Sequence, residues 1–391
     1  MKNCKCFWLN IAMIDRDIEV NFRKNILIEL SKQGVSVRAN FNYINDKIAI
    51  NEIDKVYYIK LRQKGILGKI LLNIEQQITL IKNLDADVVV LRPFNLIESL
   101  PIWFFWKKIL GRKLPKFVLD IRSIVTDDPV YIKHLQRKMR FWFSVKFAFC
   151  YFDGLTMITK IMKKDIQNVV NNFNKKIGIW SSGVNPDMFD PEKAIDISDK
   201  LKINNRFVIM YHGVFSFQRG LQQAIKAIKI VKKYHPEVLF LLLGKGRAKA
   251  ELEKLINNLN LQNNIMIHDA VSYEHVPDYI KSAKVGLLPF PDIHAWNTSS
   301  PIKLTEYLSM GKPVIVTDIE AHREALGNLK CGIFVKDHQP ENIAKGIFKI
   351  INSRSELHEL GKIARSAALE KFTLEQQALK IKKFFNELLN E

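Results

Sequence analysis

The chain of 391 residues has few cysteines and no long apolar run. Its four cysteines, Cys4, Cys6, Cys150 and Cys331, show neither the paired spacing of a zinc site nor a framework of disulfides, which favours a reducing, cytoplasmic setting. No apolar run approaches the roughly 18 to 20 residues that cross a bilayer. The first apolar run ends at Asp15-Arg-Asp17 without a small-residue cleavage site, so we expect a buried strand there and no signal peptide.

Acidic residues are also scarce, with 40 Asp and Glu against 60 Lys and Arg. The excess is local: residues 101–150 hold eleven Lys or Arg, three Asp and many aromatic residues. Cations beside large apolar side chains are typical of segments at a membrane interface, so residues 101–147 predict contact with an anionic membrane surface. A core helix with a solvated basic face is the alternative. No helix-turn-helix, zinc-finger or RNA-binding pattern is present, which argues against a nucleic-acid partner.

Strand-like apolar runs alternate with helical patterns along the whole chain. This alternation predicts two doubly wound α/β domains, at 1–180 and 181–370, with a linker within Ile177–Ile203. Residues 371–391 predict a final amphipathic helix that packs back on the first domain. The expected strands are Cys6–Ile14, Val35–Phe41, Val56–Leu61, Asp87–Leu91, Phe117–Ile121, Leu155–Thr159, Phe207–His212, Val238–Leu243, Ile265–His268, Val285–Pro289, Val314–Thr317 and Gly332–Val335.

The segment from Ser299 to Thr317 combines a helix start, a cation, a carboxylate and a helix stop. Ser300 is the expected N-cap and Pro301 the expected first helical residue, so the positive end of the helix would suit a phosphate. Lys303 and Glu306 share one helical face, where the lysine can meet a diphosphate and the carboxylate a sugar hydroxyl. An ordinary capped helix before a parallel strand is the alternative.

Two loops upstream show the same order of strand, glycine loop and helix. The strand that starts at Phe207 ends at His212-Gly213, and Arg219 lies beside the helix that Gly220 opens. The strand that starts at Val238 runs into Gly244-Lys-Gly246. Three such loops together predict a phosphate-binding rim better than any one of them alone.

With these motifs, the chain resembles glycosyltransferase family 4, whose members have the GT-B architecture of two Rossmann-like domains facing across a cleft. The resemblance covers nearly the whole length and is strongest in the second half. Its elements are Ser182-Gly-Val-Asn-Pro-Asp-Met-Phe-Asp-Pro191, the loop Gly213–Gly220, the turn Gly244-Lys-Gly246, Leu287-Leu-Pro-Phe290, and Ser300-Pro-Ile-Lys-Leu-Thr-Glu-Tyr307 with Gly311-Lys-Pro-Val-Ile315. In the first half, Asp120-Ile-Arg-Ser123 before Asp127-Asp-Pro129 resembles members that build bacterial surface polysaccharides.

The resemblance implies transfer of a sugar from a nucleotide-diphosphate sugar to a lipid-linked or polysaccharide acceptor, with retained anomeric configuration. No metal or other cofactor is expected, since fixed cations and amides would meet the charge of the leaving diphosphate. The implied catalytic residues are Arg219, Lys303 and Glu306, with Glu306 on the ribose. The implied donor-binding residues are Gly213, Gly220, Gly244, Ser300, Pro301, Ile302, Thr298 and His212. The implied location is cytoplasmic and peripheral, on the inner face of the cell membrane.

Three departures from the family pattern bear on activity. Val214 stands where an arginine is usual, with Arg219 in the place of the lysine, and Thr298 replaces the first of two paired glutamates. The glycine pair after the first strand is absent from residues 14–20. A catalytically silent, membrane-associated nucleotide-sugar binding subunit therefore stays open as an alternative, and a GT-B sugar-nucleotide epimerase is a further one.

Other polar residues have competing interpretations. Asp120 and Arg122 end a strand of the first domain, where the acceptor or a general base would lie. His212 either approaches the donor or packs in the core. Asp85-Ala-Asp87 has the Asp-x-Asp spacing of metal-dependent glycosyltransferases, but it stands directly before a strand and favours a strand-entry turn.

Overall fold

The computed structural model describes residues 4–9, 19–46, 48–61, 65–93, 114–124, 131–170 and 175–390, and these form two compact units. Unit 1 comprises residues up to Ser181 together with Leu374 onward, and unit 2 comprises Ser182–Thr373. The expected division lay after residues 180 and 370. Both units are α/β with fully parallel strand pairing, as the sequence predicted.

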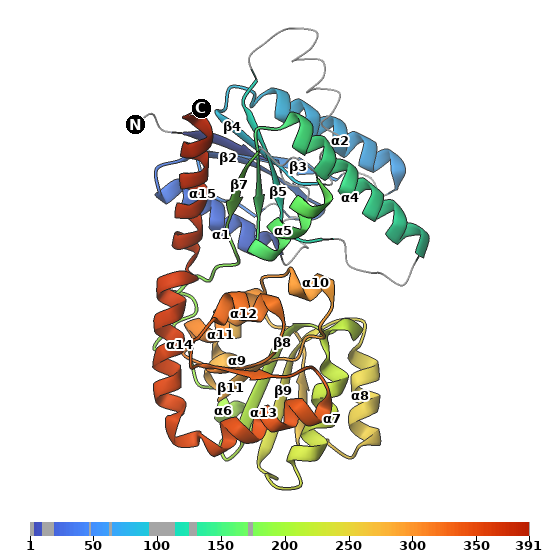
Figure 1. The fold of residues 1–391 in the computed structure, drawn as a ribbon, viewed down its shortest axis with the longest axis vertical. Coiled ribbons are helices and arrows are strands. Elements are labelled where there is room, and N and C mark those ends of the chain that lie inside the picture. Colours follow the sequence, from blue (N-terminus) through green and yellow to red (C-terminus); the bar gives the residue numbers. More distant parts are fainter. Residues whose placement is uncertain are drawn as a thin grey trace. The chain divides into compact units, whose positions relative to one another are not determined.

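Unit 1 contains a seven-stranded sheet of order β3-β2-β1-β4-β5-β6-β7 (Figure 1). Its central strands are short apolar runs buried on both faces, as the helices of a doubly wound fold require. The strands are β1 (Lys5–Trp8), β2 (Ser36–Tyr43), β3 (Lys55–Lys60), β4 (Val88–Leu91), β5 (Lys116–Ile121), β6 (Gly154–Met157) and β7 (Lys176–Ile179).

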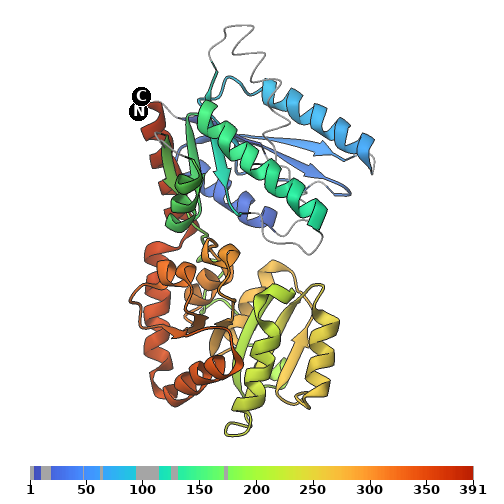
Figure 2. The same cartoon turned by 45° about the vertical axis from the view of Figure 1, so that its right-hand side comes forward.

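Separate apolar cores cover the two faces of this sheet. One face packs against α1 (Glu19–Lys32) and α15 (Leu374–Leu389), which contact each other. On the other face lie α2 (Ile66–Ile81), α4 (Tyr131–Tyr151) and α5 (Lys160–Val169). Figure 2 shows α2 in blue and α4 in green on that face.

The expected linker is wrong at its start, because β7 occupies the first residues of Ile177–Ile203 and pairs with β6. The four residues of β7 are all half-buried at the edge of the sheet, so they lack the fully apolar pattern of the inner strands. Phe384 of α15 covers this edge: a Cβ atom added at Gly178 would lie 2.8 Å from its ring. The last helix thus completes unit 1.

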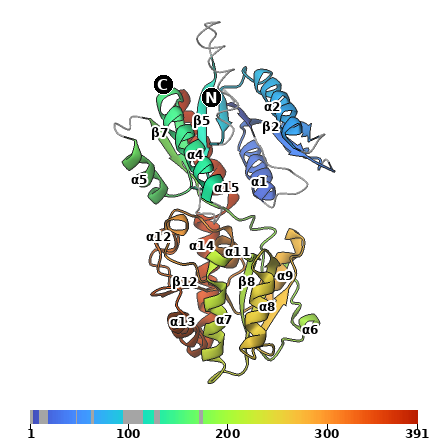
Figure 3. The same cartoon turned by 90° about the vertical axis from the view of Figure 1, so that its right-hand side faces the viewer.

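Unit 2 contains a six-stranded sheet of order β10-β9-β8-β11-β12-β13 around one apolar core. The strands are β8 (Phe207–Val214), β9 (Val238–Lys245), β10 (Ile265–His268), β11 (Val285–Leu288), β12 (Val314–Thr317) and β13 (Gly332–Val335). The helices are α6 (Ser198–Leu201), α7 (Leu221–Val231), α8 (Lys249–Asn258), α9 (Val276–Lys281), α10 (His294–Asn297), α11 (Ile302–Ser309), α12 (Glu320–Leu326), α13 (Pro340–Asn352) and α14 (Leu357–Lys371). Figure 3 shows α7 and α8 side by side, in agreement with their contacts.

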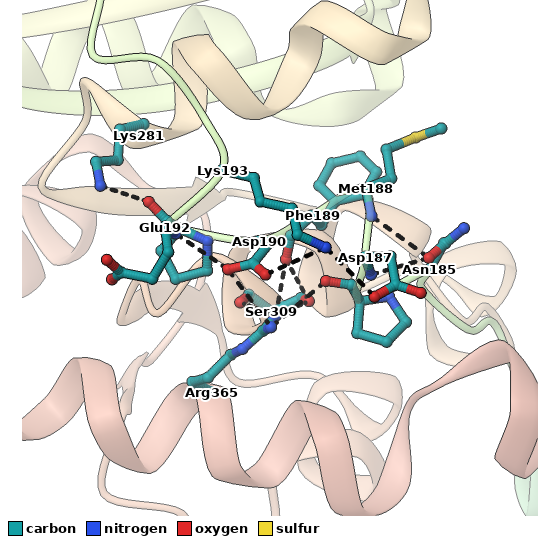
Figure 4. A network of polar contacts seen from close by, with 12 residues as sticks. Asn185, Asp187, Met188, Phe189, Asp190, Glu192, Lys193, Lys281, Ser309 and Arg365 are labelled. Carbon is teal, nitrogen blue, oxygen red and sulfur yellow. Dashed lines mark hydrogen bonds and ion pairs between the residues drawn. The ribbon is translucent and has the colours of Figure 1, made fainter.

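The loop at the start of unit 2 is held by Arg365 of α14 (Figure 4). One terminal nitrogen of Arg365 donates hydrogen bonds of 2.7 Å to the carbonyls of Phe189 and Ser309, and to Ser309 Oγ at 2.8 Å. Ser309 Oγ itself donates to the Phe189 carbonyl, and Asn185 Oδ1 accepts from the amide of Asp187 in a local turn. The asparagine–proline loop recognised in the sequence is therefore fixed to α11 and α14.

Candidate functional site

The strand order of unit 2 places a candidate site at the carboxyl ends of β8 and β11. The chain continues in opposite directions on either side of these two neighbouring strands, and ligands of doubly wound sheets bind outside such a switch point. His212 and Gly213 end β8, while Pro289 and Phe290 follow β11. The predicted donor-binding loops therefore begin at this crevice.

Glycines let the loops at this crevice approach closely. Gly220, with φ of +69°, would place a Cβ atom 1.8 Å from the carbonyl oxygen of Pro289. Gly244, with φ of +154°, would place one 1.9 Å from the carbonyl oxygen of Gly213. Both positions need the absence of a side chain and a positive φ, so the glycine spacing in the sequence has a clear structural cause.

Lys303 extends from the first turn of α11 towards Gly213. Its Nζ is buried without a hydrogen-bond partner and lies 3.7 Å from the centroid of the Tyr211 ring. A Cβ atom added at Gly213 would lie 3.2 Å from this nitrogen. Burial, and next the positive charge of Arg219, hold the pKa of Lys303 well below its usual range. A buried amine without a hydrogen-bond partner is suited to bind an anion.

Arg219 lies beside Lys303, so the structure brings the two predicted cations together. Its guanidinium is 4.9 Å from the Trp296 ring centroid and 5.9 Å from that of Phe290, and Lys303 Nζ is 5.6 Å from the same Phe290 ring. Aromatic faces stabilise cations that have left water. The two aromatic residues escaped the sequence analysis as site residues, although Phe290 closes one of the motifs recognised there.

Glu306 is buried one turn along α11 from Lys303, with both carboxyl oxygens near polar partners. Oε1 accepts a hydrogen bond of 2.5 Å from Tyr273, and Oε2 lies 3.2 Å from Nε2 of His212. Burial raises the pKa of Glu306 to about 7, while the Tyr273 hydrogen bond and Lys303 act in the opposite direction. Burial, and next Lys303, lower the pKa of His212 well below its usual range. These shifts favour a neutral imidazole beside a carboxyl group that holds its proton more firmly than a free glutamate does.

His212 is fixed at its backbone as well. Its amide donates to the hydroxyl of Tyr307 at 3.1 Å, and that hydroxyl donates to the carbonyl of Met210 at the same distance. These contacts give His212 the packing role, since its main chain is held against α11 and its buried ring faces Glu306. Its approach to the donor stays a prediction. Tyr273 lies in a short helix at Tyr273–His275, and no motif in the sequence pointed to it.

The expected helix start at Ser300 is wrong. Helix α11 begins at Ile302, Pro301 occupies the N-cap position, and no side chain caps it. Ser300 Oγ instead accepts a hydrogen bond of 3.0 Å from the amide of Ser182, and Ser182 Oγ donates to the Ser300 carbonyl. Ser300 therefore links the segment before α11 to Ser182 at the start of unit 2. Ile302 lies in the first turn of the helix, as expected.

Thr298 lies at the end of α10 and is almost fully buried. Its hydroxyl donates to the carbonyl of His294 at 3.1 Å. A threonine in this position supplies a local hydrogen bond to the helix, as is common near helix ends. Its contact with a donor sugar stays a prediction.

Asp120 and Arg122, predicted on the acceptor side, have partners within unit 1. Oδ1 of Asp120 accepts from the hydroxyl of Thr156 at 2.8 Å, deep between β5 and β6. The guanidinium of Arg122 donates to the Trp180 carbonyl and stacks 3.6 Å from the Trp180 ring centroid. Asp127 to Pro129 of the same motif lie outside the described residues, and an acceptor role for this loop stays a prediction.

The Asp-x-Asp pattern at 85–87 forms structural contacts. Asp85 makes two hydrogen bonds, of 2.8 and 3.0 Å, with the guanidinium of Arg38, and Asp87 accepts from the amide of Lys5 at 2.8 Å. Asp15 and Asp17 lie outside the described residues. Within the described ranges, no group of three His, Cys, Asp or Glu side chains is arranged to hold a metal ion.

Comparison with known proteins places these observations in a family context. Residues 193–367 match the model of the glycosyl transferases group 1 family. An uncharacterized glycosyltransferase of Methanocaldococcus jannaschii is 24% identical over half of this chain and half of its own length. The chain thus spans about half the length of that curated relative.

Two solved structures share the architecture over nearly the whole chain. A glycosyltransferase from Rickettsia africae has a TM-score of 0.72 at 18% identity and full coverage of both chains. Anabaena HepE in complex with UDP and glucose has a TM-score of 0.73 at 15% identity, with 97% and 98% coverage. The chain therefore has the GT-B fold, and most of its second unit matches the glycosyl transferases group 1 family.

Proposed function

We propose that this protein is a retaining glycosyltransferase of family 4, which moves a sugar from a nucleotide-diphosphate sugar to a lipid-linked or polysaccharide acceptor. The observation that carries the proposal is the buried, unpaired amine of Lys303 beside Arg219 at the end of β8. The match of residues 193–367 to the glycosyl transferases group 1 family supports the reaction class. A bound diphosphate would give Lys303 the partner that it lacks.

Charge on the leaving group sets the roles of the cations. Breaking the glycosyl–phosphate bond leaves a nucleoside diphosphate, and Lys303 and Arg219 would neutralise the growing charge without a metal ion. Each donates N–H groups, and Arg219 can contact two phosphate oxygens at once. Aromatic packing by Phe290 and Trp296 keeps both cations fixed before the reaction, so little reorganisation is required. Lys303 would thus supply the second positive charge at the diphosphate, which the arginine usual at position 214 would otherwise provide.

The carboxylate of Glu306 would accept hydrogen bonds from the ribose hydroxyls. To do so it must be ionised, and cationic Lys303 beside it favours that state. The hydroxyl of Tyr273 already donates to one of its oxygens and would either share that oxygen with the ribose or give way. A front-face mechanism, in which the leaving phosphate accepts the proton of the attacking hydroxyl, accounts for retention without a protein nucleophile.

We place the enzyme in the cytoplasm, peripheral on the inner face of the cell membrane, with residues 101–147 as part of the membrane contact. Residues 101–113 and 125–130 of this range lie outside the described part of the chain. Within the rest, α4 carries exposed apolar and basic side chains. A lipid-linked acceptor would be met at such a surface.

The test has a binding arm and a turnover arm. Uridine, guanosine and adenosine diphosphates are screened by thermal shift, and the best one is then titrated against Lys303→Met and Arg219→Gln. Turnover is followed as diphosphate release from the corresponding sugar nucleotide, with a lipid-linked glycan acceptor and with EDTA present. Binding and EDTA-resistant release that both depend on Lys303 support the proposal. Binding without release identifies the silent nucleotide-sugar binder that Val214 and Thr298 keep open, and no binding overturns the site.

A further inference from the structure

Helix α2 of unit 1 exposes an apolar stripe along its length. Six large apolar side chains, each 39–58% exposed, follow the helical repeat at positions i, i+3, i+4, i+7, i+11 and i+14: Leu67, Ile70, Leu71, Ile74, Ile78 and Ile81. This spacing places all six on one side of the helix. A soluble domain normally turns such a stripe towards its core, and a contiguous exposed stripe marks an interaction surface.

The opposite side of α2 faces the sheet and is mostly polar. Gln76 and Thr79 are buried there, as are Leu80, which joins the apolar core, and Asn83 just after the helix. Asn83 Oδ1 accepts from the hydroxyl of Tyr57 at 3.2 Å and from Arg38 at 3.4 Å, while its Nδ2 donates to the Thr79 carbonyl at 2.8 Å. These contacts fix which side of the helix is turned inward.

The sheet beneath α2 has a matching polar face. Along β2, Arg38, Asn40 and Asn42 alternate with apolar residues that belong to the core on the other face. Asn40 and Asn42 are fully buried, and the Asn40 amide donates to Asn42 Oδ1 at 3.4 Å. Turning α2 by half a rotation would bring its apolar stripe towards this polar part of the sheet and would turn Asn83 away from Tyr57 and Arg38, at the cost of their hydrogen bonds. The sequences of α2 and β2 therefore agree on an outward apolar stripe.

Helix α4 lies on the same face of the sheet (Figure 2). It adds apolar and basic residues to this face. Leu135, Met139 and Phe143 are exposed at intervals of four residues. The 21 residues of α4 include five Lys or Arg and no Asp or Glu. Among these cations, Lys138 and Lys146 are exposed. This face of unit 1 thus combines apolar side chains with a one-sided charge.

We propose that the outer faces of α2 and α4 form a docking surface for an anionic lipid bilayer, with the apolar stripe of α2 entering the interface. Charge complementarity selects lipid over a second copy of this chain, because a symmetric contact through this face would bring two sets of cations together. Phosphate headgroups supply the opposite charge, and the acyl boundary accepts the isoleucines. The proposal extends the membrane contact to a helix outside residues 101–147, and it does not depend on the transfer reaction.

Binding to vesicles tests the surface directly. Purified protein is floated with vesicles of neutral phosphatidylcholine alone or with added phosphatidylglycerol. Ile74→Gln/Ile78→Gln is expected to weaken partitioning onto anionic vesicles about tenfold or more, since two half-exposed isoleucines no longer enter the interface. Lys138→Gln is expected to weaken it about fivefold. The matched control, Val169→Gln/Leu379→Gln, changes two equally exposed apolar residues, of α5 and of α15, and is expected to partition normally.

A fluorescent label gives a second measurement that does not rely on loss of binding. Cys150 is exposed and the other three cysteines are buried, so Cys150→Ser leaves no exposed thiol. A polarity-sensitive dye on Ile74→Cys in this background is expected to shift to shorter wavelength with anionic vesicles, and one on Leu379→Cys is not. Three results overturn the proposal: equal binding of the Ile74/Ile78 variant, equal binding to neutral vesicles, or a dye at residue 74 that is already shielded without lipid. In the last case, light scattering that shows a dimer would assign the stripe to self-association.

Discussion

Replacing Lys303 by methionine should raise stability and lower nucleotide affinity in the same protein. The amine is buried without a hydrogen bond, and its pKa is held low by burial and by Arg219. An unsatisfied buried polar group costs about 1–3 kcal/mol. Methionine has a similar length and no polar atom, so it fills the same space without this cost. We therefore expect the empty Lys303→Met protein to unfold at a free energy about 2 kcal/mol higher than the parent.

The same substitution removes a contact that only the bound state uses. A hydrogen bond to a charged group contributes about 1.5–3 kcal/mol, so the dissociation constant of the nucleoside diphosphate should rise about 10- to 150-fold. Urea unfolding of the empty protein and calorimetric titration with the diphosphate measure the two effects separately. Opposite signs are the expected mark of a residue kept for binding at the expense of stability.

Lys312 provides the matched control, as a half-buried lysine of unit 2. Burial lowers its pKa to about 8, but its Nζ donates a hydrogen bond of 2.9 Å to the Lys281 carbonyl. Lys312→Met should therefore leave nucleotide affinity unchanged and should not stabilise the protein. The reasoning fails if Lys303→Met is destabilised and binds the diphosphate as the parent does, or if the two variants behave alike.

Three further predictions concern the frame of unit 2. Arg365→Met should lower the free energy of unfolding by about 2 kcal/mol, because the Ser309 carbonyl loses its charged donor while the Phe189 carbonyl keeps its bond from Ser309 Oγ. Lys193→Met on the same loop, where the lysine is mostly exposed, should change it by less than about 0.5 kcal/mol in urea titrations, and similar losses would contradict the clamp. The folded protein holds the proton of Glu306 more firmly than the unfolded chain does, because the pKa of this carboxyl is raised from 4.5 to about 7 on folding. The stability that this protonated carboxyl contributes is therefore complete below pH 4.5 and is lost as the pH rises to about 7. That loss amounts to about 3 kcal/mol, and a slope of stability against pH that persists in Glu306→Gln would refute it. Gly220→Ala should destabilise the protein by about 2–4 kcal/mol, because the added Cβ would overlap the Pro289 carbonyl oxygen. The control Gly34→Ala also has a positive φ, of +81°, but open space around it, and it should cost about 1 kcal/mol. Equal costs in thermal unfolding would exclude the close approach at Gly220.

The fold was largely predictable because buried parallel strands are short apolar runs that end in glycine or polar loops. Strand β7 was missed for the opposite reason: its Lys-Ile-Gly-Ile sequence lies half-exposed at an edge and depends on Phe384 from the far end of the chain. Sequence periodicity could not show that the apolar side of α2 faces outward, because that depends on polar residues of β2 brought together only by folding.

The site was predictable where local sequence determines geometry. The glycine turns and the positions of Arg219 and Lys303 follow from strand ends and helix starts in sequence order. The partners of Glu306 are a different case, since Tyr273 comes from a loop 33 residues away and carries no motif. The helix start at Ser300 failed because the amide of Ser182, 118 positions earlier, competes for its hydroxyl. Long-range hydrogen bonds of this kind leave no mark in a single sequence.

The two ends of unit 2 meet: the amide of Val184 donates to the carbonyl of Phe372 at 2.8 Å, and Val184 pairs with Thr373. Unit 2 is therefore one unbroken stretch of chain inserted into unit 1 through adjacent entry and exit points. During synthesis, the last helix of unit 1 is made only after all of unit 2, so unit 1 cannot complete its fold before then. A gene ending at residue 373 would encode all of unit 2 joined to a unit 1 that lacks its closing helix.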